Sequence, residues 1–143
     1  MTTAITRRQD ATFECGGAAI RAHSRHLATV ITVRGEIDAV NGDRVSAHVR
    51  RFVDGTNPVV LDLSEVTCFS PVGVGMLCML DDDCRVAGVQ WSLVASPAVI
   101  EVLGDHAGAM FPITHSVYEA LRNLADAIVS RRQMVLSLIR KTA

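Results

Sequence analysis

The stretch from Pro58 to Met79, PVVLDLSEVTCFSPVGVGMLCM, decides the fold that we expect for this chain. Its apolar start, Val59–Leu63, is bounded by a proline and by polar residues, which is typical of a buried strand. A loop should follow. Ser70-Pro71 then predicts a helix start, because serine can accept first-turn N–H groups and proline at the first helical position leaves no N–H unpaired. The tip of a strand–loop–helix unit is the usual binding edge of an α/β domain, so we expect function at Thr67–Gly73.

Length and composition predict one globular domain. The chain has 143 residues, of which 49% are hydrophobic and 20% charged, enough for one core and too few for two ordinary domains. A net charge of −1, with few aromatic residues, argues against nucleic acid as a partner. The N-terminus does not resemble a signal peptide, and the longest apolar stretch, residues 71–80, is too short to span a bilayer. We therefore expect a cytoplasmic protein without a membrane span.

The sequence nominates no catalytic or metal site. The four cysteines, at positions 15, 68, 78 and 84, form no C-x-x-C pair and are expected to be buried or half-buried thiols. A catalytic cysteine would need a histidine base, and none is indicated. Asp81-Asp82-Asp83 lies within the predicted helix, where successive side chains point about 100° apart and do not converge on one ion. We expect no metal, no cofactor and no enzymatic activity.

Strand and helix patterns alternate along the rest of the chain. Strands are predicted at Ala18–His23, Leu27–Arg34, Val89–Ala95 and Phe111–Ile113, the first two joined by a hairpin connection. Helices are predicted at Asn41–Asp54, with Asn41 as N-cap and Gly55 as C-cap, from Ser96-Pro97 to Gly104, and from Ser116 through at least Ile128, with Glu119 completing a capping box.

This order predicts an α/β fold with a mixed, mainly parallel sheet covered by about four helices. The expected organisation is a flexible arm at residues 1–14, one domain at 15–128 and a helical extension at 129–143.

Four short motifs resemble one known family. They are Gly35-Glu36-Ile37-Asp38 followed by Asn41, Val60-Leu61-Asp62-Leu63-Ser64, Phe69-x-x-x-Gly73, and Phe111-Pro112-Ile113. In this order and at these spacings they resemble the STAS domain, the sulfate-transporter and anti-sigma-factor-antagonist family, in its stand-alone bacterial form. The resemblance runs from about Ala18 to Ala125.

The resemblance implies a non-enzymatic module that regulates transcription by partner switching. Such a domain docks on an anti-sigma factor that is also a protein kinase and so frees a sigma factor. The kinase reverses this by phosphorylating a serine just before a glycine, commonly in Asp-Ser-Ser-Gly. Here the matching residues are Ser70-Pro71-Val72-Gly73, and Val72 at the acceptor position has no hydroxyl. We expect a docking shape that is kept and a covalent switch that is lost.

The expected partner-binding residues follow from the same match. Asp38 and Asn41 correspond to positions beside the central loop on the family's partner-binding face, although ending a strand and capping a helix would explain them equally. Ser70 could accept a phosphate, but an N-cap role is preferred. The expected binding set is Asp38, Asn41, Thr67, Ser70, Pro71, Val72 and Gly73.

Two further interpretations stay open at this stage. Related stand-alone domains also serve as small subunits of lipid-transport ATPase complexes, which is the alternative function. The stretch Val117–Ile139 carries an apolar heptad seam interrupted by Arg131. Beyond Ile128 this seam needs cover from a second copy in a homodimer, a partner helix, or a membrane surface helped by Arg131, Arg132, Arg140 and Lys141, unless it is a frayed tail.

Overall fold

A computed structural model describes residues 11–25 and 28–142, with side chains described as far as Ile139. The elements in chain order are β1 (Phe13–Cys15), β2 (Ala18–Arg25), β3 (Ala28–Ile37), α2 (Gly42–Arg50), β4 (Val59–Phe69), α3 (Val72–Ala87), β5 (Trp91–Ala95), α4 (Pro97–Leu103), the 3-10 turn η1 (Gly104–His106), α5 (Ala107–Met110), β6 (Ile113–Thr114) and α6 (Val117–Thr142).

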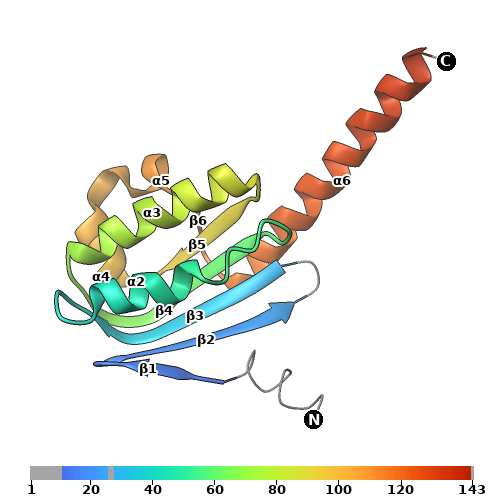
Figure 1. Ribbon diagram of the computed structural model, residues 1–143. Helices are drawn as coiled ribbons and strands as arrows, with labels where there is room; N and C mark the ends of the chain where they lie inside the picture. The colour runs from blue at the N-terminus through green and yellow to red at the C-terminus, as the bar shows by residue number, and fades with distance from the viewer. Residues whose placement is uncertain (1–10, 26–27, 143) are drawn as a thin grey trace, which may run out of the picture.

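The strands form one six-stranded sheet in the order β1-β2-β3-β4-β5-β6 (Figure 1). The pairs β1–β2 and β2–β3 are antiparallel, and β3, β4, β5 and β6 are parallel neighbours. Parallel neighbours need a crossover, which α2, α3 and α4 provide. The predicted fold class, α/β with a mixed and mainly parallel sheet, is confirmed.

The central strands are buried on both faces. On one face Ile31 and Leu61 pack with residues of α2, α3 and α4 in the larger core cluster. On the other face Val30 and Val60 pack against Ala120 and Leu124 of α6 in a smaller cluster. Neighbouring residues of a strand point to opposite faces, so the continuous apolar run of β4 serves both layers.

The first strands extend beyond their predicted limits, whereas β5 begins at Trp91 rather than Val89 and β6 at Ile113 rather than Phe111. Residues 13 and 14, assigned to a flexible arm, belong to β1, so that assignment is wrong for them; residues 1–10 lie outside the described part. The Phe13 ring stacks on His48 of α2 with centroids 4.1 Å apart. This contact joins β1 to α2, and the polar sequence around Phe13 gives no sign of it. Burial, followed by the charge of Arg51, lowers the pKa of His48.

The loop expected after Leu63 is also wrong, because β4 continues to Phe69. Val66 and Phe69 both join the larger core, which explains why the strand extends so far. The helix predicted to reach Asp54 ends at Arg50, with Arg51 rather than Gly55 at its C-cap.

Two predicted caps are confirmed. Ser96 Oγ accepts the Val99 N–H at 3.3 Å, with proline at the start of α4. Ser116 Oγ accepts the Glu119 N–H at 3.0 Å at the start of α6. Each cap satisfies a first-turn N–H that would otherwise be unpaired.

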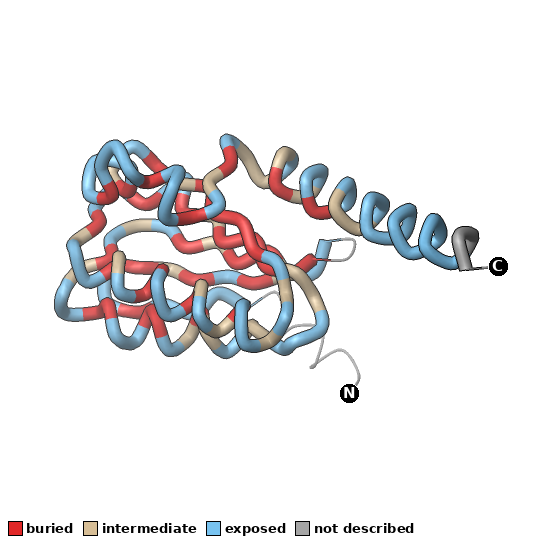
Figure 2. Tube along the Cα trace, turned by 90° about the horizontal axis from the view of Figure 1, so that it is seen from above, coloured by how far each residue is buried: buried red, intermediate tan, exposed pale blue. Residues whose placement is uncertain are grey.

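Helix α6 continues past the sheet as a single helix of 26 residues (Figure 1). Its first turns pack on the sheet through Ala120 and Leu124, with Val117 and Leu121 partly buried beside them. Figure 2 shows the distal part free of the other elements, and residues 129–139 are all exposed. Within the described ranges, no helix is both long and apolar enough to cross a membrane.

Replacing Leu77 by alanine should lower the free energy of unfolding by about 2–5 kcal/mol, because it leaves a cavity in the larger core. Leu77 is completely buried, whereas Val86 on the same helix is 89% exposed. Val86→Ala is the matched control and should change stability by less than about 0.5 kcal/mol. Urea unfolding followed by circular dichroism measures both; equal effects would contradict this packing.

Candidate functional site

The carboxyl ends of β3 and β4 meet at one edge of the sheet, where α2 and α3 begin (Figure 1). The last residues of the two strands, Ile37 and Phe69, are register partners. The Ser70 N–H donates to the Ile37 carbonyl at 2.9 Å and holds the two chain exits together. This edge therefore presents residues from two separate parts of the sequence.

The Asp38–Asn41 corner is built by hydrogen bonds to its own backbone. Asn41 Oδ1 accepts the Asp38 N–H at 2.9 Å, and Asn41 Nδ2 donates to the carbonyls of Glu36 at 2.8 Å and Cys15 at 3.0 Å. Asp38 Oδ1 accepts the N–H groups of Val40 and Asn41 at 2.9 and 3.0 Å. These bonds turn Val40 outward, where it is 88% exposed.

Asn41 occupies the N-cap position of α2, but its side chain does not cap the helix. The predicted capping role is therefore wrong: the amide is only 1% exposed and is directed inward to the Cys15 and Glu36 carbonyls. A buried amide with three partners shapes the corner and cannot itself be a contact surface.

The Ser70–Gly73 segment differs from its prediction in the same way. Helix α3 begins at Val72, with Pro71 at the N-cap and no side-chain cap bond, so Ser70 is not the N-cap and proline is not the first helical residue. Ser70 Oγ is buried and has no hydrogen-bond partner among the described residues. The reason is that Ser70 still belongs to the strand exit, held by Ile37, while Pro71 with φ −55° already has helical geometry.

Two glycines allow the chain to pack tightly here. A Cβ on Gly73 would overlap the Phe69 ring, and a Cβ on Gly42 would lie 2.5 Å from Val72 Cγ1. Gly73 is buried, so it contributes by letting the start of α3 pack against the Phe69 ring and not by contacting a partner. Val72 rests over the start of α2 and remains 41% exposed.

Helices α2 and α3 lie side by side along a seam that starts at this edge. After the Gly42–Val72 contact come Ser46 Oγ to Met79 Sδ at 3.8 Å and Arg50 Nε to Asp83 Oδ2 at 2.6 Å. Exposed apolar or proline residues gather over the seam and the corner. We call this set the tip patch: Val40, Pro71, Val72 and Met79.

The structure thus separates the predicted binding residues into two groups. Pro71 and Val72 are exposed in the tip patch, and Asp38 is half-buried beside it. Asn41, Ser70 and Gly73 support the patch from within. Thr67 is exposed but lies inside β4, its hydroxyl donating to the Gly35 carbonyl at 3.3 Å.

Val40 and Met79 were not among the binding residues expected from the sequence. A valine between two turn-forming polar residues, Asp38 and Asn41, was the available signal for Val40. No local signal marked Met79, because its exposure depends on how α2 packs against α3.

The thiols give no sign of nucleophilic chemistry. Cys15 and Cys84 are buried, but Cys68 and Cys78 are exposed, so the expectation of buried or half-buried thiols is wrong for the latter two. Burial, followed by the charges of Asp83 and Asp81, raises the pKa of Cys84 to about 11. No group of three metal-ligating side chains occurs in residues 11–25 and 28–142.

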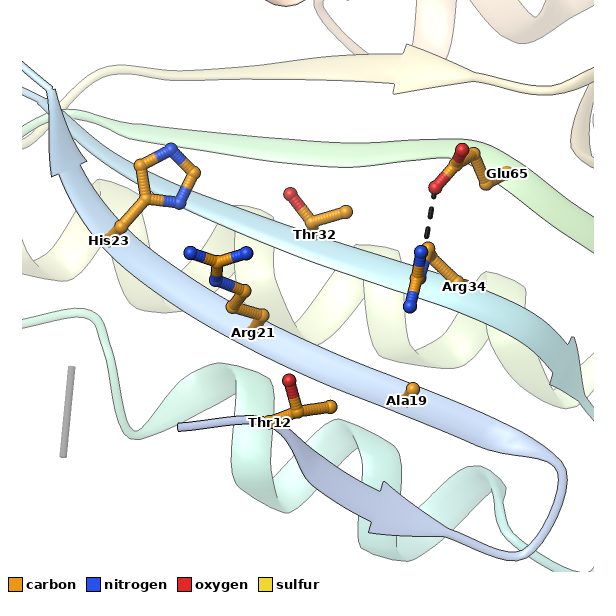
Figure 3. Close-up of a pocket in the computed structure, with 7 residues that line it drawn as sticks. All are labelled: Thr12, Ala19, Arg21, His23, Thr32, Arg34 and Glu65. Carbon is orange, nitrogen blue, oxygen red and sulfur yellow. Dashed lines mark ion pairs between the residues drawn. The ribbon is translucent and has the colours of Figure 1, made fainter. Parts of the chain in front are cut away.

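A hollow of about 230 Å³ lies on the open face of the sheet, away from α2 and α3 (Figure 3). It is lined by Thr12, Ala19, Arg21, His23, Thr32, Arg34 and Glu65. Arg34 Nε and Glu65 Oε2 are 3.8 Å apart within it, and both side chains are more than half exposed. A solvent-screened lining with both signs of charge selects no ligand class.

The STAS domain model matches residues 19–120, so the chain belongs to the STAS domain family. The chain is 58% identical to Osmosensory protein A of Mycobacterium tuberculosis, over 96% of this chain and 90% of that protein.

Solved anti-sigma-factor antagonists share the fold. One from Mycobacterium paratuberculosis is 21% identical with a TM-score of 0.64, covering 76% of this chain and 94% of that one. SpoIIAA in its unphosphorylated form is 14% identical with a TM-score of 0.61, covering 75% of this chain and 96% of that one.

Replacing Asn41 by alanine should lower the free energy of unfolding by about 3 kcal/mol, because it leaves an N–H and two carbonyls unpaired at a buried site. Asn123→Ala, the same change at an exposed position of α6, is the control and should be nearly neutral. Thermal unfolding compares the two proteins. A neutral Asn41→Ala would mean that the corner does not depend on this amide.

The Gly42–Val72 contact predicts strong coupling between these positions. Gly42→Ala should destabilise the protein by about 1–3 kcal/mol by displacing Val72, and Val72→Ala should cost less because Val72 is partly exposed. The double variant should recover about 0.5–3 kcal/mol relative to the sum of the single changes. Gly75→Ala is the control, since a Cβ there meets nothing within 4 Å. Additive effects in urea unfolding would contradict the contact.

Proposed function

We propose that this protein is a regulatory protein-binding module of the anti-sigma-factor-antagonist type that docks its partner on the tip patch. The carrying observation is the exposure of Val40 and Val72, 88% and 41% respectively, on a corner that buried hydrogen bonds hold in place. Apolar side chains at the centre of an interface, on a pre-organised backbone, supply binding energy with little loss of conformational entropy.

The partner we propose is an anti-sigma factor of the kinase type, met in the cytoplasm, which makes the function one of transcription regulation by partner switching. Several solved structures of the same fold are anti-sigma-factor antagonists, which supports this over the lipid-transport ATPase subunit as the alternative. A protein partner suits the tip patch because the patch is apolar and exposed.

We further propose that phosphorylation does not switch this surface. SpoIIAA, which shares the fold, has a solved structure in its unphosphorylated form. In this chain the side chain of Val72 has no hydroxyl that could accept a phosphate. Ser70, the nearest hydroxyl in the segment, has its Oγ buried and is closed to a kinase active site. The docking surface is therefore constitutive, with the partner's availability setting its occupancy.

Binding should depend on the apolar character of the tip patch. We expect Val40→Asp/Val72→Asp to weaken binding to a copurifying kinase-type anti-sigma factor by about thirtyfold or more, because truncating or charging a central apolar contact removes at least about 2 kcal/mol. Val86→Asp makes the same change at an exposed valine at the far end of α3 and should leave affinity unchanged. Isothermal titration calorimetry measures both.

Equal affinity of Val40→Asp/Val72→Asp and Val86→Asp for that partner would contradict docking at the tip patch. Copurification of an ATPase subunit in place of a sigma-regulating kinase would favour the alternative function. A stoichiometric phosphate on residues 67–73 after incubation with the kinase and ATP, read by intact-protein mass and peptide mapping, would contradict the proposal that phosphorylation does not switch this surface.

A further inference from the structure

The distal part of α6, residues 129–139, carries several large apolar side chains that are exposed to solvent. We call it the α6 tail. Its large apolar residues are between 51% and 68% exposed: Val129, Met134, Val135, Leu136, Leu138 and Ile139. A short isolated helix is marginal in water, and most helical stability comes from packing of an apolar face. An exposed apolar surface of this kind marks an interaction site.

The apolar surface covers more than half of the helix circumference. At about 100° per residue, the apolar positions from Ile128 to Ile139 span an arc of about 220°. Only a narrow strip formed by Ser130, Gln133 and Ser137 is neutral and polar. Two hollows that share no residue flank the helix. One, of about 440 Å³, lies over the polar strip with Met134 and Leu138 at its sides, and the other, of about 510 Å³, lies on the apolar arc beside Val135 and Leu136.

The charge of this region has one sign. After Asp126 the sequence contains no acidic residue, whereas it contains Arg131, Arg132, Arg140 and Lys141. Arg131 and Arg132 fall within the apolar arc, and both line the hollow beside Val135. Whatever covers the tail must therefore accept apolar side chains and cations on the same surface.

A second copy of the chain does not meet this requirement. Two paired tails would bring Arg131 and Arg132 of both copies together, with no acidic residue in the sequence beyond Asp126, and like charges in contact are destabilising. The open sheet face of another copy is polar, and its carboxylate, Glu65, already lies 3.8 Å from Arg34 (Figure 3). A homodimer through α6 is thus the weaker interpretation.

We propose that the α6 tail binds in the plane of an anionic lipid surface. Immersion in the headgroup region covers a wide apolar arc from several sides at once, which a single partner helix cannot do. Arginine side chains within the arc can extend their guanidinium groups to lipid phosphates while their methylene stems stay in apolar surroundings. The neutral strip at Ser130, Gln133 and Ser137 then faces water. This activity is separate from docking at the tip patch.

The test is cosedimentation of the full chain with phosphatidylcholine vesicles that contain about one-third phosphatidylserine or none. We expect binding only to the anionic vesicles. Arg131→Gln/Arg132→Gln should weaken this binding roughly thirtyfold, since each cation near such a surface contributes about fivefold in affinity. Val135→Ser/Ile139→Ser should abolish it, and Ser130→Ala/Ser137→Ala on the polar strip should leave it unchanged.

Controls separate this proposal from the others. The changed side chains are exposed, so circular dichroism and thermal unfolding of the domain should not alter. Val40→Asp/Val72→Asp should bind vesicles normally, so failure of partner docking and failure of lipid binding are distinguishable. The proposal is overturned by absence of vesicle binding, by equal binding to both vesicle types, or by a dimer in light scattering that disappears in Val135→Ser/Ile139→Ser.

Discussion

Burial of β4 on both of its faces is the constraint on which the rest of the structure depends. Leu61 packs toward α2 and α3, and Val60 packs toward α6. Because β3, β4 and β5 are parallel neighbours, each must be followed by a helix that returns across a face of the sheet. The starts of α2 and α3 are thereby brought to one edge, where the tip patch lies.

The tip patch, the surface proposed for docking, combines buried residues that determine its shape with exposed apolar side chains. Asn41 and Gly73 are buried and determine where the backbone goes, and Gly42 allows Val72 to settle between the helix starts. Val40 and Val72 are left on the outside of a backbone that has little freedom. A surface of this kind suits binding without covalent switching, because its shape does not depend on a modifiable group.

The α6 tail has a different physical character from the tip patch. It continues the helix that covers the smaller core but projects beyond the sheet (Figure 2). Its apolar residues are therefore exposed, whereas Leu124 is buried against the sheet. It also carries Arg131 and Arg132, whereas the four residues of the tip patch are uncharged and Arg50 Nη1 lies 3.8 Å from Met79 Sδ. The two surfaces lie on different elements.

The sequence by itself determined the α/β class, the burial of Val59–Leu63, the serine caps of α4 and α6, and the absence of a hydroxyl at Val72, because each follows from local periodicity or residue chemistry. The family motifs also placed the tip near Val72. Only the tertiary structure decided that Asn41 and Ser70 face inward, that β1 attaches through the Phe13–His48 stack, and that Val40 and Met79 are exposed. Those outcomes depend on contacts between residues distant in the chain, and hydrogen bonds from Asn41 to the Cys15 carbonyl or a glycine beneath Val72 leave no periodic pattern in the residues around them.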